Sequence, residues 1–182
     1  METDIRLTTV DWLSRVIIRH LGKEDLPDLE WDGEYTHFRR VYSDTHERAC
    51  KGFALNWVVE LENIGIIGQV FIQLKCDRPE LADGNTRVYM HSFRIKPAFR
   101  QSGLGSKLLQ VIEEDVHLRG FQFMTLNVAL DNVTAQRLYK RNGYKIIAYE
   151  PGQWSYPDHH GVWQNVNEPA WRMEKDISAA YK

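Results

Sequence analysis

Apolar side chains recur at two different periods along this chain, and the two periods predict a sheet covered by helices. Between residues 103 and 119 they recur every fourth residue, which predicts a helix with one apolar stripe facing a sheet. Gly120 follows, where a glycine that ends a helix is expected. Other segments with helical character are 23–30, 34–50 and 132–142.

Strand-like runs, rich in β-branched and aromatic residues, predict the sheet itself. Asn63 and Gly65 indicate a tight turn that joins two of these runs into a hairpin. The run 86–95 alternates regularly, which predicts that His91 and Phe93 share one face and that Arg94 lies on the other. The predicted strands cover residues 15–21, 53–61, 66–74, 86–95, 123–130, 144–150 and 170–177, and an aromatic, histidine-rich loop is expected over 151–167.

The order of these elements, β-α-α-β-β-β-α-β-α-β-β, predicts one α/β (α+β) domain with a mixed sheet. A length of 182 residues, 43% of them hydrophobic, suits one domain with a sizeable core. The net charge of −2 has both signs interspersed, so we expect neither a nucleic-acid nor a membrane surface. Two cysteines give no disulfide framework, and no secretory-signal pattern is visible, so a cytoplasmic location is expected.

The segment "FRQSGLG" (99–105) lies between a predicted strand and the start of a helix. Backbone N–H groups left open by Gly103 and Gly105 can form an anion-binding nest, and the positive end of the helix dipole adds to it. Arg100 supplies further donors for phosphate oxygens. The alternative is that the glycines only make a tight turn, since Leu108 stands where a dinucleotide fingerprint would place its third glycine.

Two motifs together resemble the GNAT (Gcn5-related N-acetyltransferase) superfamily. Pro97-x-x-Arg100-x-x-Gly103-x-Gly105 resembles its acetyl-CoA-binding motif, and "NVTAQRLYKRNGY" (132–144) resembles its second signature. The resemblance covers roughly residues 15–177, which leaves 1–14 as an N-terminal extension and 178–182 as a C-terminal tail. It implies a sheet whose fourth and fifth strands splay apart, with acetyl-CoA in the cleft as co-substrate and no metal.

The resemblance also implies which residues hold the cofactor. The strand backbone at Phe93, Arg94 and Ile95 is expected to contact the pantetheine and the thioester. Asn132 is expected to bond the pantetheine arm, although an asparagine at this position also makes a sound helix cap. The pyrophosphate is expected to lie on Arg100, Gln101, Ser102, Gly103, Leu104, Gly105 and Ser106.

Catalytic roles are implied for two side chains. Tyr139 occupies the position of the tyrosine that commonly protonates the leaving thiolate, or else simply packs in its helix. Some members of the family carry a glutamate base on the fifth strand, but Asn127 stands there and cannot accept the proton. His91 matches a histidine that other members use, and an imidazole suits a base at neutral pH. A packed structural histidine and a water-mediated role for Glu60 are the alternatives.

The expected activity is direct acetyl transfer to a primary amine, either a small amine or a peptide amine. The alternative is a non-catalytic acetyl-CoA-binding or regulatory module. The acceptor is expected to lie near Glu30, Asp32 and Glu34 and near the aromatic residues of 151–167, which fits a cationic amine without identifying it. "DHH" (158–160) is expected to be a surface loop rather than a metal site, and a homodimer is common in the family.

Overall fold

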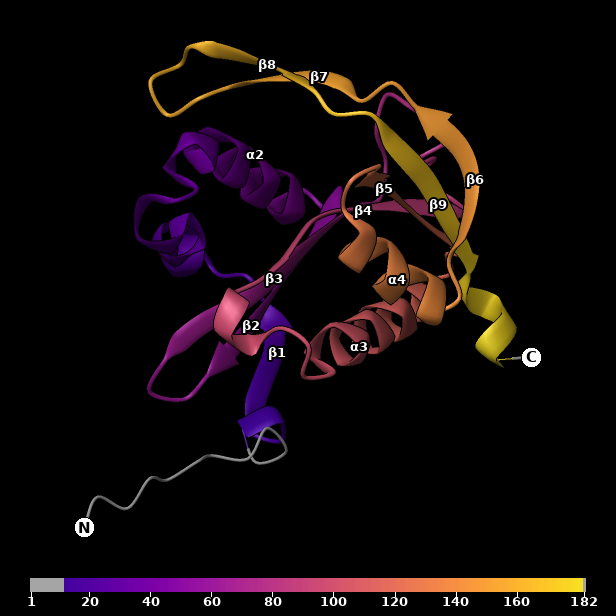
Figure 1. Ribbon diagram of the computed structural model, residues 1–182, viewed down its shortest axis with the longest axis horizontal. Helices are drawn as coiled ribbons and strands as arrows, with labels where there is room; N and C mark the ends of the chain where they lie inside the picture. The colour runs from indigo at the N-terminus through magenta and orange to yellow at the C-terminus, as the bar shows by residue number, and fades with distance from the viewer. Residues whose placement is uncertain (1–11, 182) are drawn as a thin grey trace.

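The computed structural model describes residues 12–181, and these form one mixed sheet with helices on both faces (Figure 1). Every neighbouring pair of strands in this sheet is antiparallel except β4 and β5, which are parallel. The described part of the sheet has seven strands, in the spatial order β1 (Val16–His20), β2 (Ala54–Leu61), β3 (Gly65–Gln73), β4 (Arg87–Ile95), β5 (Phe123–Ala129), β9 (Ala170–Asp176) and β6 (Lys145–Glu150). The predicted α/β (α+β) architecture with a mixed sheet is confirmed, and the sheet is mostly antiparallel.

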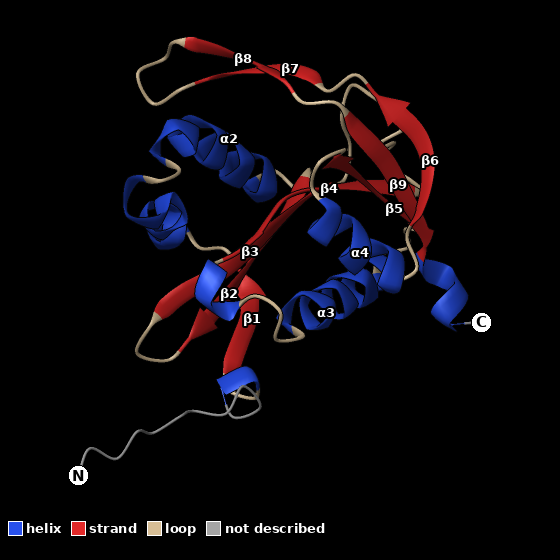
Figure 2. Cartoon of the chain, in the orientation of Figure 1, coloured by secondary structure: helices blue, strands red, loops and turns tan. Residues whose placement is uncertain are grey.

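Helices cover the two faces unequally (Figure 2). One face carries α3 (Leu104–Leu118) and α4 (Val133–Arg141), which pack on the larger core. The other face carries the 3-10 segments η1 (Lys23–Gly33) and η2 (Thr36–Phe38) together with α2 (Arg39–Cys50), above a smaller core. We call these the α3 face and the α2 face. Two short 3-10 turns, η3 (Pro97–Phe99) and η4 (Ile177–Tyr181), follow β4 and β9.

The first helical region is less regular than its sequence suggests. The segment predicted from residue 23 is a 3-10 run rather than an α-helix, and Pro27 within it lacks the N–H that an α-helix requires. Trp31 and Asp32 have positive φ, which breaks the run. Because of this break, the helix predicted over 34–50 begins its α-helical part only at Arg39.

A β-bulge divides β4 into two halves. His91 pairs with Phe71 and Arg94 with Gln69, so two residues of β4 lie opposite one residue of β3. Ser92 has a φ of 51°, a conformation that a non-glycine residue rarely adopts. The predicted alternation is therefore wrong beyond His91, because a bulge shifts every later side chain to the other face.

The consequence appears in the packing of the side chains. Phe93 and Ile95 pack on the core under α3, whereas Arg94 lies against the rings of Tyr35 and Phe38 on the α2 face. His91 contacts Phe71, which belongs to the core under α2. The side chains of β4 beyond the bulge therefore point to both the α2 face and the α3 face.

The two central strands diverge as predicted. Their parallel ladder runs from Arg87 opposite Phe123 to Met90 opposite Leu126 and then stops, although both strands continue. Beyond that pair, no described strand pairs with the facing edges of β4 and β5. The fold therefore leaves a V-shaped opening with unpaired backbone groups along it.

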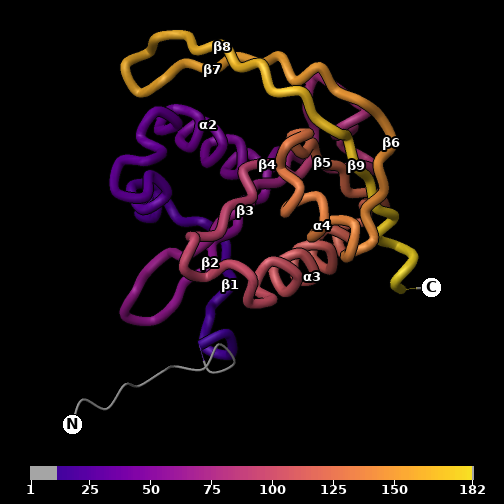
Figure 3. Tube along the Cα trace, viewed as in Figure 1, coloured from indigo at the N-terminus to yellow at the C-terminus, as the bar shows by residue number. Residues whose placement is uncertain are grey.

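The expectation of a loop over 151–167 is wrong. The segment forms a β-hairpin of β7 (Gln153–Pro157) and β8 (Trp163–Asn167), which lies beside α2 although the two are far apart in the sequence (Figure 3). Trp154 and Tyr156 alternate with Ser155, which suits a strand with one apolar face. Asp158 stabilises the turn by accepting hydrogen bonds from the N–H groups of His160 and Val162.

The ends of the described chain are packed. Trp12 contacts Phe99 edge to face, and Lys107 Nζ donates to the carbonyl of Leu13 at 3.0 Å. Most of the predicted N-terminal extension, residues 1–11, lies outside the described residues, as does residue 182. In the C-terminal tail, Tyr181 stacks on His117. Within the described residues, no helix is long and apolar enough to cross a membrane.

Candidate active site

The loop before α3 has a backbone geometry that suits an anion, and we call it the anion-binding loop. Gln101 and Gly103 both have positive φ, at 55° and 87°, which turns the backbone sharply into the helix. Within the described residues, the N–H groups of Gly103, Gly105 and Ser106 have no acceptor, while that of Leu104 donates only a long hydrogen bond, at 3.4 Å, to Ser102 Oγ. Free N–H groups at the start of a 15-residue helix favour a phosphate or another anion.

The two glycines of this loop have different tasks. A side chain at Gly103 would have room, with only Leu13 at 4.0 Å, but its φ of 87° is unfavourable for any other residue. At Gly105, a Cβ would lie 3.2 Å from Leu138 of α4. Gly103 therefore sets the loop conformation, and Gly105 allows α3 and α4 to pack closely.

The remaining residues predicted around the phosphates lie at the same helix end. Arg100 Nε donates to the carbonyl of Ile95 at 2.7 Å, which leaves its other N–H groups exposed to solvent. Ser106 Oγ accepts a hydrogen bond from Asn142 at the end of α4. Ser102 Oγ donates to the carbonyl of Phe99. These contacts tie the loop to the strand before it and to the helix that follows the opening.

Asn132 caps α4. Its side-chain oxygen accepts a hydrogen bond from the N–H of Ala135 at 3.1 Å, so its structural role is evident. The cap lies just beyond the end of β5, next to the opening. Its amide nitrogen makes no hydrogen bond with a described residue, which leaves that group available to a ligand in the opening.

Tyr139 lies on the α3 face, 8% exposed, with its ring near Phe93 of β4 and Tyr144. Its hydroxyl has no hydrogen-bond partner among the described residues. Burial, together with the nearby Tyr89, raises the pKa of Tyr139 well above its ordinary value. The phenol therefore keeps its proton at neutral pH, which is the state that a proton donor needs.

His91 lies on the α2 face of the opening. Its Nδ1 lies 3.2 Å from Ser92 Oγ, and its buried Nε2 has no hydrogen-bond partner among the described residues. Burial, with the nearby positive charges of Arg94 and Arg48, lowers the pKa of His91 to about 4. The imidazole is therefore neutral at physiological pH and can accept a proton.

Two other residues considered for the base are placed differently. Glu60 lies on β2, separated from β4 by β3, and its carboxylate is held by Arg19 at 2.8 Å. Asn127 lies on β5 just past the last ladder pair, and its buried Oδ1 has no partner among the described residues. Asn127 thus lines the start of the opening, whereas Glu60 lies one strand further away and is already paired with Arg19.

Arg94 is a predicted site residue whose side chain the sequence pattern misplaces. Its guanidinium lies 4.3 Å from the ring centre of Tyr35 and 5.1 Å from that of Phe38. One of its N–H groups donates to the hydroxyl of Tyr42 at 3.1 Å. Only the bulge at Ser92 explains why this side chain points to the α2 face.

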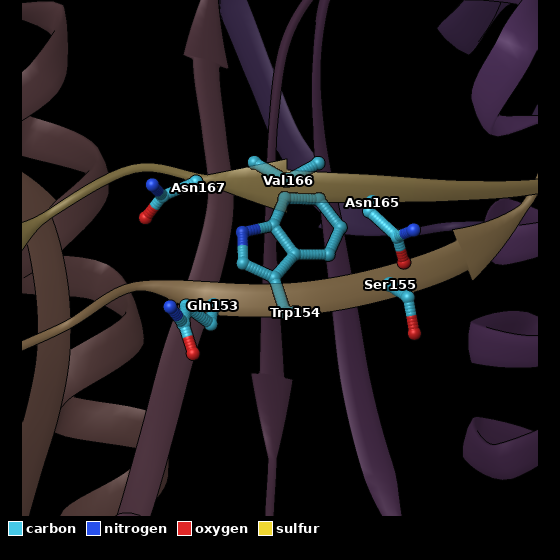
Figure 4. Close-up of a pocket in the computed structure, with 6 residues that line it drawn as sticks. All are labelled: Gln153, Trp154, Ser155, Asn165, Val166 and Asn167. Atoms are coloured by element: carbon cyan, nitrogen blue, oxygen red, sulfur yellow. The ribbon is translucent and has the colours of Figure 1, made fainter.

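Aromatic side chains from two distant segments form the outer wall of the α2 face. Phe38 lies 4.8 Å from Tyr156 and 6.4 Å from Trp154, measured between ring centres, and its ring is nearly parallel to that of Trp154. Figure 4 shows Trp154 beside Val166 between the hairpin strands, flanked by the polar side chains of a surface depression. The hairpin thus supplies the aromatic wall that was expected from a loop.

The acidic residues expected to attract an amine contribute little free charge. Glu30 is paired with Arg39 and accepts a hydrogen bond from Thr36, and these contacts lower the pKa of Glu30 below its ordinary range. Asp32 and Glu34 are exposed to solvent. Trp163, at 66% exposure, also faces solvent rather than the wall.

A model of the acetyltransferase (GNAT) family matches residues 19–144 of this chain. Among solved structures, the spermidine/spermine N-acetyltransferase of Vibrio cholerae is similar over 93% of this chain and 97% of its own, with 16% identity and a TM-score of 0.69. The ribosomal-protein-S18-alanine N-acetyltransferase of Escherichia coli is similar over 89% of this chain and 94% of its own, with 20% identity and a TM-score of 0.65.

A third similar structure contains a cofactor. A spermidine N-acetyltransferase of Vibrio cholerae in complex with CoA and spermine is similar over 93% of this chain and 99% of its own, with 16% identity and a TM-score of 0.67. These similarities show a shared fold, and the family match covers both the anion-binding loop and the signature around Tyr139. The chain belongs to the acetyltransferase (GNAT) family and is an N-acetyltransferase by class.

Proposed function

We propose that this protein transfers an acetyl group directly from acetyl-CoA to a primary amine. The observation that carries the proposal is the opening between β4 and β5, which connects the two faces of the sheet. An anion-binding loop lies at one end of it, a phenol on the α3 face and an imidazole on the α2 face. Two reactants can therefore approach each other from opposite sides.

The residues around the opening fit acetyl-CoA, which supplies an activated acetyl thioester. The free N–H groups of Gly103, Gly105 and Ser106 suit its pyrophosphate. Unpaired edges of β4 and β5 suit the amide groups of its pantetheine arm, because an extended chain can bond to an open strand edge. Asn132 lies where its amide nitrogen can bond the same arm.

The surroundings of His91 favour a neutral amine. A neutral imidazole with a free Nε2 can accept the proton of an ammonium group. The burial and positive charges that lower the pKa of His91 also act on a cation bound beside it. They lower the pKa of the bound ammonium, so the ammonium gives up its proton more readily and the neutral, nucleophilic amine forms.

The remaining steps concern the thioester. The backbone of β4 at the bulge lies at the opening and can stabilise the tetrahedral oxyanion through an N–H group. Tyr139 is protonated and lies on the cofactor side, so it can protonate the leaving thiolate. Tyr139 as the acid and His91 as the base therefore act from opposite faces of the sheet. This arrangement suits a thiolate that leaves on the α3 face and an amine that approaches from the α2 face.

The structures similar to this chain support an amine acceptor in general terms, since their names specify spermidine, spermine and a ribosomal-protein alanine. A non-catalytic acetyl-CoA-binding module is the alternative. It finds no support in these comparisons, and a protonated Tyr139 and an unprotonated His91 beside the opening favour turnover.

Thermal unfolding with and without acetyl-CoA tests the cofactor. At about 100 times its Kd, a ligand adds about 2.7 kcal/mol to the free energy of unfolding, which corresponds to a Tm increase of roughly 5–10 °C. Acetyl-pantetheine, which lacks the pyrophosphate, serves as the matched control and is expected to give a much smaller shift. No shift at millimolar acetyl-CoA would contradict the proposal.

Turnover is tested by release of free thiol in the presence of primary amines. Release that depends on the amine supports acetyl transfer. A clear thermal shift without thiol release from any amine would instead favour the binding module.

A further inference from the structure

Arg94 carries a positive charge on the acceptor side that no described residue balances. Its guanidinium forms no ion pair within residues 12–181, and one N–H donates to the neutral hydroxyl of Tyr42. The rings of Tyr35 and Phe38 contact its charged plane. A guanidinium has five N–H donors in a fork that matches a carboxylate, so most of its hydrogen-bonding capacity is unused.

The carboxylate of the same wall does not supply the missing charge. Glu30, whose side chain is 14% exposed, is held by Arg39 and Thr36. His91 is neutral at physiological pH, and Arg48 adds a second positive charge near it. The inner part of the α2 face is therefore electropositive, which is unfavourable for a polyamine.

A buried amide beside Arg94 is also poorly satisfied. Gln69 is directly opposite Arg94 in the ladder and is fully buried, and its side chain lies beside the hydroxyl of Tyr42. Even so, neither its Nε2 nor its Oε1 makes a well-formed hydrogen bond with a described residue. Leaving a buried polar group unsatisfied costs about 1–3 kcal/mol. Arg94, Gln69 and the Nε2 of His91 thus form a cluster of polar groups with unused hydrogen-bonding capacity.

The cofactor does not fill this cluster with its phosphates. The anion-binding loop borders Ile95 and Leu138 on the α3 face, whereas the Arg94 side chain lies among Tyr35, Phe38 and Tyr42 on the α2 face. Because of the bulge at Ser92, the Arg94 side chain points to the α2 face, away from the anion-binding loop. An anion at Arg94 must therefore come from the acceptor.

We infer that the acceptor is an amino carboxylate with an apolar body, such as an aromatic amino acid. This inference rests on the proposed function. The carboxylate binds the guanidinium of Arg94 and the amide nitrogen of Gln69, which places the neighbouring amine toward His91. The apolar body lies against the rings of Phe38, Trp154 and Tyr156, which come together on this face.

The test compares four amines with wild-type protein at saturating acetyl-CoA. L-phenylalanine carries the carboxylate, L-phenylalaninamide replaces it with a neutral amide, phenethylamine lacks it, and spermidine is a polycation. Thiol release is expected to give the highest kcat/KM for phenylalanine, by roughly 10- to 100-fold over the amide, as expected for hydrogen bonds to a charged group.

Variants of Arg94 separate recognition of the carboxylate from the reactivity of the amine. Arg94→Met is expected to lower kcat/KM for phenylalanine roughly 10- to 100-fold more than that for the amide, because losing the charge beside His91 affects both amines while losing the carboxylate contact affects only phenylalanine. Arg94→Lys keeps the charge without the fork and is expected to lie between. Arg119→Met, which alters an exposed arginine paired with Asp115, is the matched control and is expected to match wild type for every amine.

Equal rates for the three phenyl compounds, or a preference for spermidine, would overturn the inference and leave acetyl transfer intact. Thiol release from none of the amines would count against the proposed function instead. Calorimetric titration of phenylalanine into the CoA-loaded protein gives a second readout that needs no turnover. Binding that Arg94→Met abolishes supports the inference, and absence of binding by the wild type overturns it.

Discussion

The proposed cofactor side and the proposed acceptor side of the opening are built in different ways. On the cofactor side, the candidate binding groups are backbone N–H groups of a short loop at the start of α3, and glycines set their geometry. On the acceptor side, side chains from four separate segments meet: those of η1–α2, β3, β4 and the β7–β8 hairpin.

This difference explains what each side can recognise. A backbone nest depends on a local run of residues and binds a phosphate group whatever else the ligand carries. A site made of side chains from several segments depends on the whole fold, and single substitutions in it can change which acceptor it binds. We therefore expect changes at the loop to affect every reaction of the protein, and changes on the α2 face to affect particular acceptors.

The largest expected effect comes from the loop. Gly103→Val should raise the Kd for acetyl-CoA roughly 10³-fold, because it disturbs two or more N–H groups that bind a charged ligand. Gly120→Val is the matched control, since Gly120 has a similar φ of 93° and open space but lies at the other end of α3. Both should lose stability from backbone strain, and only Gly103→Val should lose affinity. Calorimetric titration measures the Kd, and equal affinities would show that the loop only turns the chain.

The next effect distinguishes chemistry from packing on the cofactor side. Tyr139→Phe should lower kcat about 10²-fold with little change in cofactor affinity, because it removes the proton donor. In the neighbouring Tyr144, the hydroxyl donates to Glu113 at 2.8 Å. Tyr144→Phe should therefore lower the free energy of unfolding by about 1–3 kcal/mol and leave kcat unchanged. A wild-type kcat for Tyr139→Phe would assign the proton donor elsewhere.

The smallest effect concerns acid stability on the acceptor side. The pKa of His91 is lowered to about 4 in the folded protein, against 6.5 ordinarily, so between these values the unfolded chain binds more protons. Stability is complete above pH 6.5 and falls as the pH drops toward 4. At pH 5 the loss from His91 is about 2 kcal/mol.

His91→Gln should remove this part of the pH dependence. Urea unfolding of both proteins at pH 7 and pH 5 isolates it, because the other titrating groups are common to both. Parallel losses in the two proteins would mean that His91 is not buried in the neutral form.

Much of the cofactor side could be predicted from the sequence, because its determinants are local. The glycine spacing indicated the loop, and the four-residue period indicated α3. The turn at Asn63 and Gly65 was also predictable, since both have positive φ in the structure. Local signals of this kind depend only on neighbouring residues.

The acceptor side could not be predicted in the same way. The bulge at Ser92 leaves no mark in an alternating pattern, because a non-glycine residue holds the positive φ and only the partner strand reveals the extra residue. In the sequence, the exposed aromatic residues of the β7–β8 hairpin do not differ from those of an aromatic loop, so the pattern did not indicate strands. The break at Trp31 likewise depends on tertiary packing, since Trp31 is buried.

The bulge at Ser92 also makes the backbone conformation of β4 important. The same residues without a bulge would alternate regularly after His91, which would turn Phe93 toward α2 and the Arg94 side chain toward α3. A phenyl ring would then stand where the acceptor side has its guanidinium, and a guanidinium where Tyr139 has its aromatic neighbour. The one extra residue that the bulge accommodates therefore decides on which face of the sheet each later side chain of β4 lies.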